Sequence, residues 1–211
     1  MKFSTRELTT IAVFGTLWGI VEMSLGTVFK SLNVPVSGVV LSAIGLTVAL
    51  VGRFFVPRRG STLFIGVIAA LLKLFSLGGV LLGPMVGIIS EALIADLALS
   101  ALGKPRRTSF VLAGSLGVLW ALVQPLVTGP LFFGRAVYDA WLKLLDRGGD
   151  LLGLDSNAAL WIILGMAGLH LLIGSLAGWL AWDVGCQLQA RLGREPVPAT
   201  DLQVTDITNE N

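Results

Sequence analysis

Long apolar runs dominate this chain, and they restrict its fold more than any other feature. The first covers residues 11–29 and reads IAVFGTLWGIVEMSLGTVF, close to the ~20 residues that cross a bilayer as a helix. It exceeds the apolar core of a signal peptide, about 7–15 residues, so we expect a retained helix. Only 13% of the 211 residues are charged, whereas soluble domains average about 25%. The composition therefore indicates an all-α integral membrane protein.

Six segments have this apolar character, and they predict a bundle of six transmembrane helices within one membrane domain, residues 1–190. The expected spans are residues 8–30, 34–52, 61–77, 80–102, 108–128 and 157–183. The segment 130–156 is too polar to span, and its apolar stripe around Trp141 predicts an amphipathic helix on the outer membrane surface. Residues 191–211 contain prolines and many polar side chains, which predicts a disordered cytoplasmic tail.

The distribution of lysine and arginine predicts the orientation, because cytoplasmic loops carry an excess of these residues. One side of the expected helices holds Lys2, Arg6, Arg53, Arg58, Arg59, Lys104, Arg106, Arg107, Arg191 and Arg194. The other side holds Lys30, Lys73, Arg135, Lys143 and Arg147, the last three diluted by aspartates. Both termini are therefore expected in the cytoplasm, which agrees with an even number of spans.

Charged residues inside the apolar runs mark a candidate site. Glu22 shares one helical stripe with three glycines of the first run. A carboxylate there costs several kcal/mol, of the order of 3, unless it is paired or faces a polar cavity. Glu91 and His170 likewise lie on glycine stripes of their own runs. Three helices that each place a polar group on a close-packing face predict a bundle around a binding site.

The candidate substrate-binding residues combine carboxylates, amides, one imidazole and aromatic rings toward the outer half of the bundle. They are Glu22, Lys73, Glu91, Trp120, Gln124, Trp141, Asn157, Trp161 and His170. Such a set suits a small, flat, polar or cationic organic molecule. Structural roles remain open: Lys73 can pair with Glu22 or Glu91, His170 can bond another helix, and Trp161 can lie in the interfacial belt.

Enzymatic motifs are absent from the sequence. It contains no G-x-x-x-x-G-K-[ST], no H-E-x-x-H and no G-x-S-x-G. A single cysteine, Cys186, and a single histidine offer no metal-ligand cluster. We therefore expect no enzymatic activity, no cofactor and no metal. Because the basic residues lie at loop ends, we expect membrane lipid rather than nucleic acid around the chain.

The sequence resembles the substrate-binding S components of energy-coupling factor (ECF) vitamin transporters. The similarity covers most of residues 5–190 and depends on the size, the six spans, the small residues of the first run and LLGPMVGIISEALIADLAL at 81–99. The stretch PRRGSTLFIGVIAALLKLF at 57–75 is similar to the thiamine-related YkoE type. The resemblance implies an all-helical receptor in the plasma membrane of a prokaryote.

That resemblance also implies a function and partners. Such a receptor captures a vitamin or vitamin precursor from outside, here with a thiamine- or pyrimidine-like heterocycle favoured, between the outer ends of its fourth to sixth helices. It docks on a transmembrane coupling subunit that is driven by cytoplasmic ATPases. Small residues of the first helix mediate the docking in that family, and here they map to Ala12, Gly15 and Gly19.

Two other functions remain compatible with the sequence. One is a stand-alone proton- or cation-coupled carrier, in which Glu22, Glu91 and Asp96 form a proton relay. The other is a membrane scaffold that assembles through its glycine faces. The receptor predicts tight binding without transport by this chain alone, the carrier predicts uptake that depends on an ion gradient, and the scaffold predicts neither.

Overall fold

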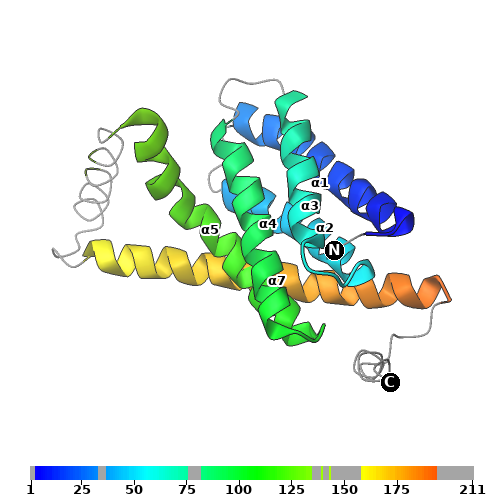
Figure 1. Cartoon of the computed structure of the whole chain (residues 1–211). Coiled ribbons are helices and arrows are strands. Elements are labelled where there is room, and N and C mark those ends of the chain that lie inside the picture. Colours follow the sequence, from blue (N-terminus) through cyan, green and yellow to red (C-terminus); the bar gives the residue numbers. More distant parts are fainter. Residues whose placement is uncertain are drawn as a thin grey trace, which may run out of the picture.

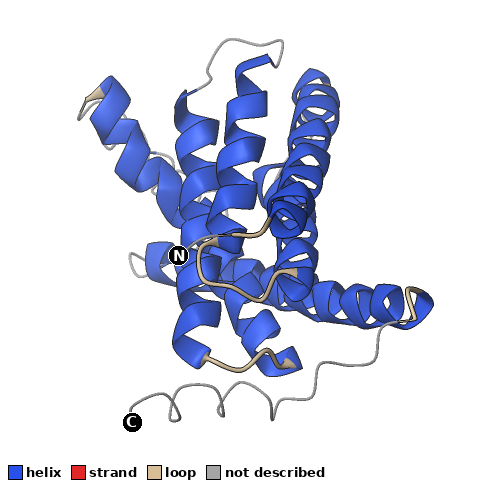
Figure 2. Ribbon diagram, turned by 45° about the vertical axis from the view of Figure 1, so that its right-hand side comes forward, coloured by secondary structure: helices blue, strands red, loops and turns tan. Residues whose placement is uncertain are grey.

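The structure, a computed structural model, describes residues 3–32, 37–75, 82–134 and 158–193 together with the single positions 139 and 143. Within these ranges every regular element is helical, as Figure 2 shows. The elements are α1 (Thr5–Ser31), α2 (Ser37–Phe55), α3 (Ser61–Leu72), the 3-10 turn η1 (Lys73–Phe75), α4 (Leu82–Leu102), α5 (Arg107–Phe133) and α7 (Ala158–Arg191).

Five helices in the described ranges are long and apolar enough to cross a membrane. Their spans are Thr5–Phe29, Ser37–Phe55, Leu82–Leu102, Arg107–Pro130 and Leu160–Arg191. The all-α character is thereby confirmed for the described residues, and the length and composition of these five helices are those of a multi-pass membrane protein. The third expected span instead forms 12 residues of α3 and three of η1. Together they extend about 24 Å, short of the ~30 Å hydrocarbon core. The count of six spans and the cytoplasmic termini stay predictions.

Helix α2 lies between two apolar clusters that form the core. On one side Leu46 and Leu50 pack with Phe110 and Val118 of α5. On the other side Ala49 packs into a cluster that joins α1, α3 and α4. Helix α2 is therefore packed against other helices on both of its faces.

The longest helix, α7, crosses α5 and α2 as one continuous rod (Figure 1). Its contact with α5 depends on glycines: a Cβ atom added at Gly174 would lie 2.7 Å from the Cα of Ser115. Beside this contact, the hydroxyls of Ser115 and Ser175 lie 2.8 Å apart. Because glycine lets the backbones approach this closely, the predicted stripe of Gly174 and Gly178 serves packing within the chain.

A buried carboxylate fixes the start of α3. Asp96 of α4 accepts the N–H of Gly60 at 3.0 and 2.9 Å and the N–H of Thr62 at 3.2 Å. Gly60 has φ 89°, a left-handed conformation that favours glycine. Arg53, which we expected at a loop end, is instead buried and pairs with Asp96 at 3.3 Å. Asp96 thus joins α2, α3 and α4.

Candidate functional site

Glu22 and Lys73 form a buried ion pair between α1 and η1. The ammonium of Lys73 donates to the Glu22 carboxylate at 3.1 Å and to the Glu22 backbone carbonyl at 2.8 Å. Both residues are at most 9% exposed. Gly26 lies next to the pair, and a Cβ atom there would come within 3.1 Å of the Lys73 Nζ. Glu22 therefore points into the bundle as the glycine stripe predicted, and the ion pair with Lys73 is one of the alternatives left open above.

Glu91 is a second buried carboxyl group, and it has no such partner. It is 5% exposed. Among the described residues, no basic side chain lies within ion-pair distance of it. Glu91 interacts electrostatically with the Ser42 hydroxyl and with the Glu22 carboxylate. The Ser42 Oγ is buried and makes no hydrogen bond of normal geometry to any described group. The Ser42 hydroxyl is thus the described polar group that faces the Glu91 carboxyl group, and no described cation pairs with that carboxyl group.

The contact between α4 and α5 brings two further predicted residues to the level of Glu91. The amide of Gln124 packs over Gly87 and donates to the Gly83 carbonyl at 2.7 Å. Seven residues before Gln124 on α5, a Cβ atom at Gly117 would lie 3.4 Å from the Glu91 carbonyl oxygen. Trp120 lies between these two contact points on the same helical stripe. Its indole N–H is buried without a hydrogen-bond partner in the described part of the chain.

Trp18 is a member of this region that the sequence interpretation missed. It is fully buried, and its indole nitrogen lies against Gly45 of α2. That N–H also finds no hydrogen-bond acceptor among the described residues. The spacing of four residues between Trp18 and Glu22 on α1 could have indicated it, since both fall on one face. Ser42, which interacts with Glu91, was missed as well, because a single serine in an apolar run is no signal of a site.

We call Trp18, Glu22, Ser42, Lys73 and Glu91 the interior polar cluster. It joins α1, α2, η1 and α4, and each of its members is 9% exposed or less. Buried polar groups in proteins are nearly always hydrogen-bonded. An indole N–H without an acceptor and a carboxyl group without a cation, both in one cluster, therefore indicate a place where a further polar group completes the bonding.

Two of the remaining predicted residues lie on α7, which contributes no member to this cluster. His170 is buried on α7, and its ring nitrogen Nδ1 bonds the Met166 carbonyl of the same helix at 2.8 Å. Trp161 is 70% exposed on α7, as an interfacial belt residue would be. Trp141 and Asn157 lie outside the described residues, as does most of the segment 130–156.

The predicted docking face on α1 needs a correction. A Cβ atom at Gly15 would lie 2.7 Å from that of Ile68, and one at Gly19 would lie 2.6 Å from Leu72. Both glycines therefore pack against α3 of the same chain, so the prediction that they receive a partner helix is wrong. Ala12 remains exposed. The spacing of small residues indicated a close helix contact correctly, but it did not show which helix makes that contact.

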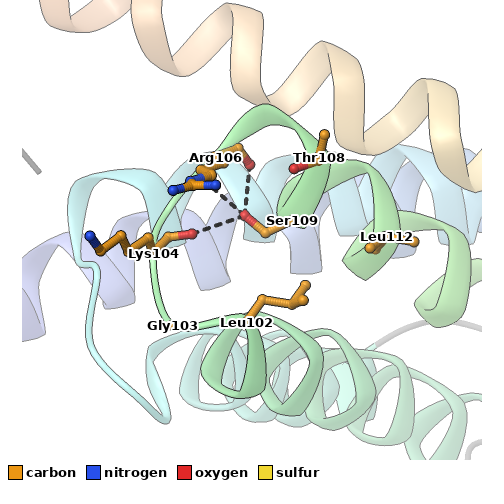
Figure 3. A pocket seen from close by; sticks show the side chains of 7 residues that line it. All are labelled: Leu102, Gly103, Lys104, Arg106, Thr108, Ser109 and Leu112. Carbon is orange, nitrogen blue, oxygen red and sulfur yellow. Dashed lines mark hydrogen bonds between the residues drawn. The ribbon is translucent and has the colours of Figure 1, made fainter.

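A hollow of about 380 Å³ lies at the turn between α4 and α5. Its lining residues are Leu102, Gly103, Lys104, Arg106, Thr108, Ser109 and Leu112 (Figure 3). The Ser109 hydroxyl donates to the carbonyls of Lys104 and Arg106 at 3.2 and 2.7 Å, which holds the turn together. Leu102 follows Glu91 by about 16 Å along α4, at about 1.5 Å per residue. The hollow is therefore separate from the interior polar cluster.

Comparison with known proteins gives no family for this chain: no family model, curated protein or solved structure matches it.

Proposed function

We propose that this chain is a membrane-embedded receptor that binds a small polar or cationic organic molecule from outside the cell. The ligand occupies the region of the interior polar cluster and the adjoining α4–α5 contact. By its resemblance to ECF S components, the ligand is a vitamin or vitamin precursor, and a thiamine- or pyrimidine-like heterocycle is favoured. The chain acts in the plasma membrane of a prokaryote and hands its ligand to a coupling subunit and cytoplasmic ATPases.

The observation that carries this proposal is a set of buried polar groups without partners in the interior polar cluster and at the adjoining α4–α5 contact. The carboxyl group of Glu91 is buried without a cation, while the indole N–H groups of Trp18 and Trp120 are buried without acceptors among the described residues. A folded chain that needed these residues only for stability would gain by replacing them with apolar ones, since unpaired buried polar groups cost about 1–3 kcal/mol each. A ligand with hydrogen-bond donors and acceptors supplies the missing partners.

Two of the three carboxylates in the carrier alternative are already bonded to other groups of the chain. Asp96 is engaged by the Arg53 guanidinium and by the backbone N–H groups of Gly60 and Thr62. Glu22 is engaged by Lys73. A proton relay through all three carboxylates would have to break both arrangements, whereas a receptor leaves them in place and uses Glu91.

Retention of a ligand during purification tests the proposal. The full chain is purified in mild detergent, denatured, and its small-molecule extract is quantified by mass spectrometry. We expect one molecule in the extract of the wild type that falls at least tenfold in Glu91→Gln, because a charge-assisted hydrogen bond of about 1.5–3 kcal/mol is lost. Trp161→Ala is the matched control and should retain it, because that side chain is exposed.

Equal amounts in the wild type and Glu91→Gln, or no molecule at all, would contradict the proposal.

An uptake assay in liposomes distinguishes the receptor from the stand-alone carrier. The purified chain alone in liposomes should bind the recovered molecule without accumulating it, with or without a pH gradient. Accumulation driven by such a gradient would favour the stand-alone carrier instead.

A further inference from the structure

The charged side chains near Glu91 can be listed from the elements that pack against α4. Helices α2, α3 and α5 contact α4, and η1 continues α3. The charged side chains on these elements are Arg53 on α2, Lys73 on η1 and Arg107 on α5. Each already has a carboxylate partner, respectively Asp96 of α4, Glu22 of α1 and Asp183 of α7.

Every cation on the described parts of α2, α3, η1 and α5 thus has a carboxylate partner, and Glu91 has none. If Glu22, Lys73 and Glu91 were all ionised, the interior polar cluster would carry one net negative charge. Transfer of an unpaired carboxylate to a membrane interior costs several kcal/mol, of the order of 3 or more. The nearby negative charge of Glu22 adds to that cost.

A neutral carboxylic acid removes this cost and uses the neighbouring hydroxyl. The protonated Glu91 can donate its O–H to Ser42, whose oxygen is otherwise unpaired among the described groups. The cluster is then electrically neutral. A second neutral arrangement exists when one positive charge enters and Glu91 is ionised. A neutral ligand leaves the proton in place, and a dication leaves an uncompensated positive charge.

We propose that the empty site holds a proton on Glu91 and that a ligand with a single positive charge takes its place. The O–H bond of the carboxylic acid breaks, the proton passes to water outside, and the carboxylate pairs with the incoming cation. One cation enters for each proton that leaves, so the site is neutral before and after. This inference rests on the proposed function and names the charge class of its ligand.

The exchange of a proton for the ligand determines how ligand affinity depends on pH. Since protons and ligand compete for one carboxyl group, affinity rises with pH by up to about tenfold per pH unit while Glu91 titrates. Above that range affinity becomes independent of pH. A purely structural role for Glu91 would give no such linkage, because the same group would be in the same state with and without ligand.

Infrared difference spectroscopy on the ligand-free full chain tests whether Glu91 is protonated when no ligand is bound. At neutral pH the wild type should show the carbonyl stretch of a protonated carboxylic acid that is missing from Glu91→Gln. Asp183→Asn is the matched control and should keep the band, because Asp183 lies in a half-exposed ion pair with Arg107. Absence of the band from the wild type shows an ionised Glu91 and overturns the proton exchange.

The ligand-bound state, in which an ionised Glu91 pairs with a monocation, is tested with the molecule recovered from the purified wild type. Its charge is determined, and the loaded protein is washed at falling pH. A monocation that is released progressively as the pH falls supports the exchange. A neutral, anionic or dicationic molecule, or retention independent of pH, overturns it while the receptor function stands. Recovery of no molecule refutes the receptor function and the exchange together, whereas a missing carboxylic acid band refutes the exchange alone.

Discussion

Removing the ammonium of Lys73 tests whether the Glu22–Lys73 pair holds α1 against η1. The side chains are 9% and 11% exposed, and Lys73 donates two hydrogen bonds to Glu22. Lys73→Met leaves a buried carboxylate without a partner, and breaking a buried pair in this way costs about 3–5 kcal/mol. Replacing both charges, in Glu22→Gln with Lys73→Met, should cost less than the lysine change alone, since the double mutant leaves no buried charge without a partner.

The assay is reversible unfolding of the purified chain in mixed micelles, followed by far-ultraviolet circular dichroism. A double-mutant cycle gives the coupling free energy of the pair, which we expect at about 2 kcal/mol or more. Glu22→Gln alone supplies the fourth corner of the cycle. If the two single changes simply add in the double mutant, the pair contributes no coupling and the assigned role of Lys73 is refuted.

Three further predictions concern packing and ligand retention. Asp96→Asn should destabilise the fold by about 3–5 kcal/mol because it leaves a buried guanidinium without a carboxylate. Asp183→Asn, in the half-exposed pair with Arg107, should cost below about 1 kcal/mol in the same unfolding assay. Gly174→Leu should separate α5 from α7 and lower the midpoint of thermal unfolding, whereas Gly165→Leu, with no described atom within 4 Å, should not; equal midpoints would contradict the close contact. Trp120→Phe should reduce ligand retention in the mass-spectrometric assay while folding is unchanged, and full retention would remove its indole N–H from the site.

The sequence was enough to predict that the carboxylates of Glu22 and Glu91 face the interior of the helix bundle. Glu22 follows glycines at helical spacing, and a charge in a membrane helix avoids lipid, so its place inside the bundle follows from periodicity and cost. The same reasoning placed Glu91 on the face that carries Gly87, and the structure confirms that this face is buried. These are local properties of one helix.

Properties that depend on the neighbouring helix could not be predicted. The stripe of Gly15 and Gly19 indicated a close contact, but α3 rather than a partner fills it. Arg53 looked like an orientation signal at a loop end, yet it pairs with a carboxylate 43 residues away. Trp18 became a candidate only when the structure showed that its indole N–H has no partner among the described residues. Each outcome depends on which helices meet and at what register.

A structure of the protein carrying the molecule that it retains on purification tests the central claim most directly. We predict a small organic molecule in contact with the Glu91 carboxylate and with an indole N–H of Trp18 or Trp120. The Glu22–Lys73 pair and the Asp96 contacts should be unchanged in that structure. A loaded structure with the molecule bound elsewhere, and with Glu91 paired to a basic side chain of the chain itself, would contradict the account.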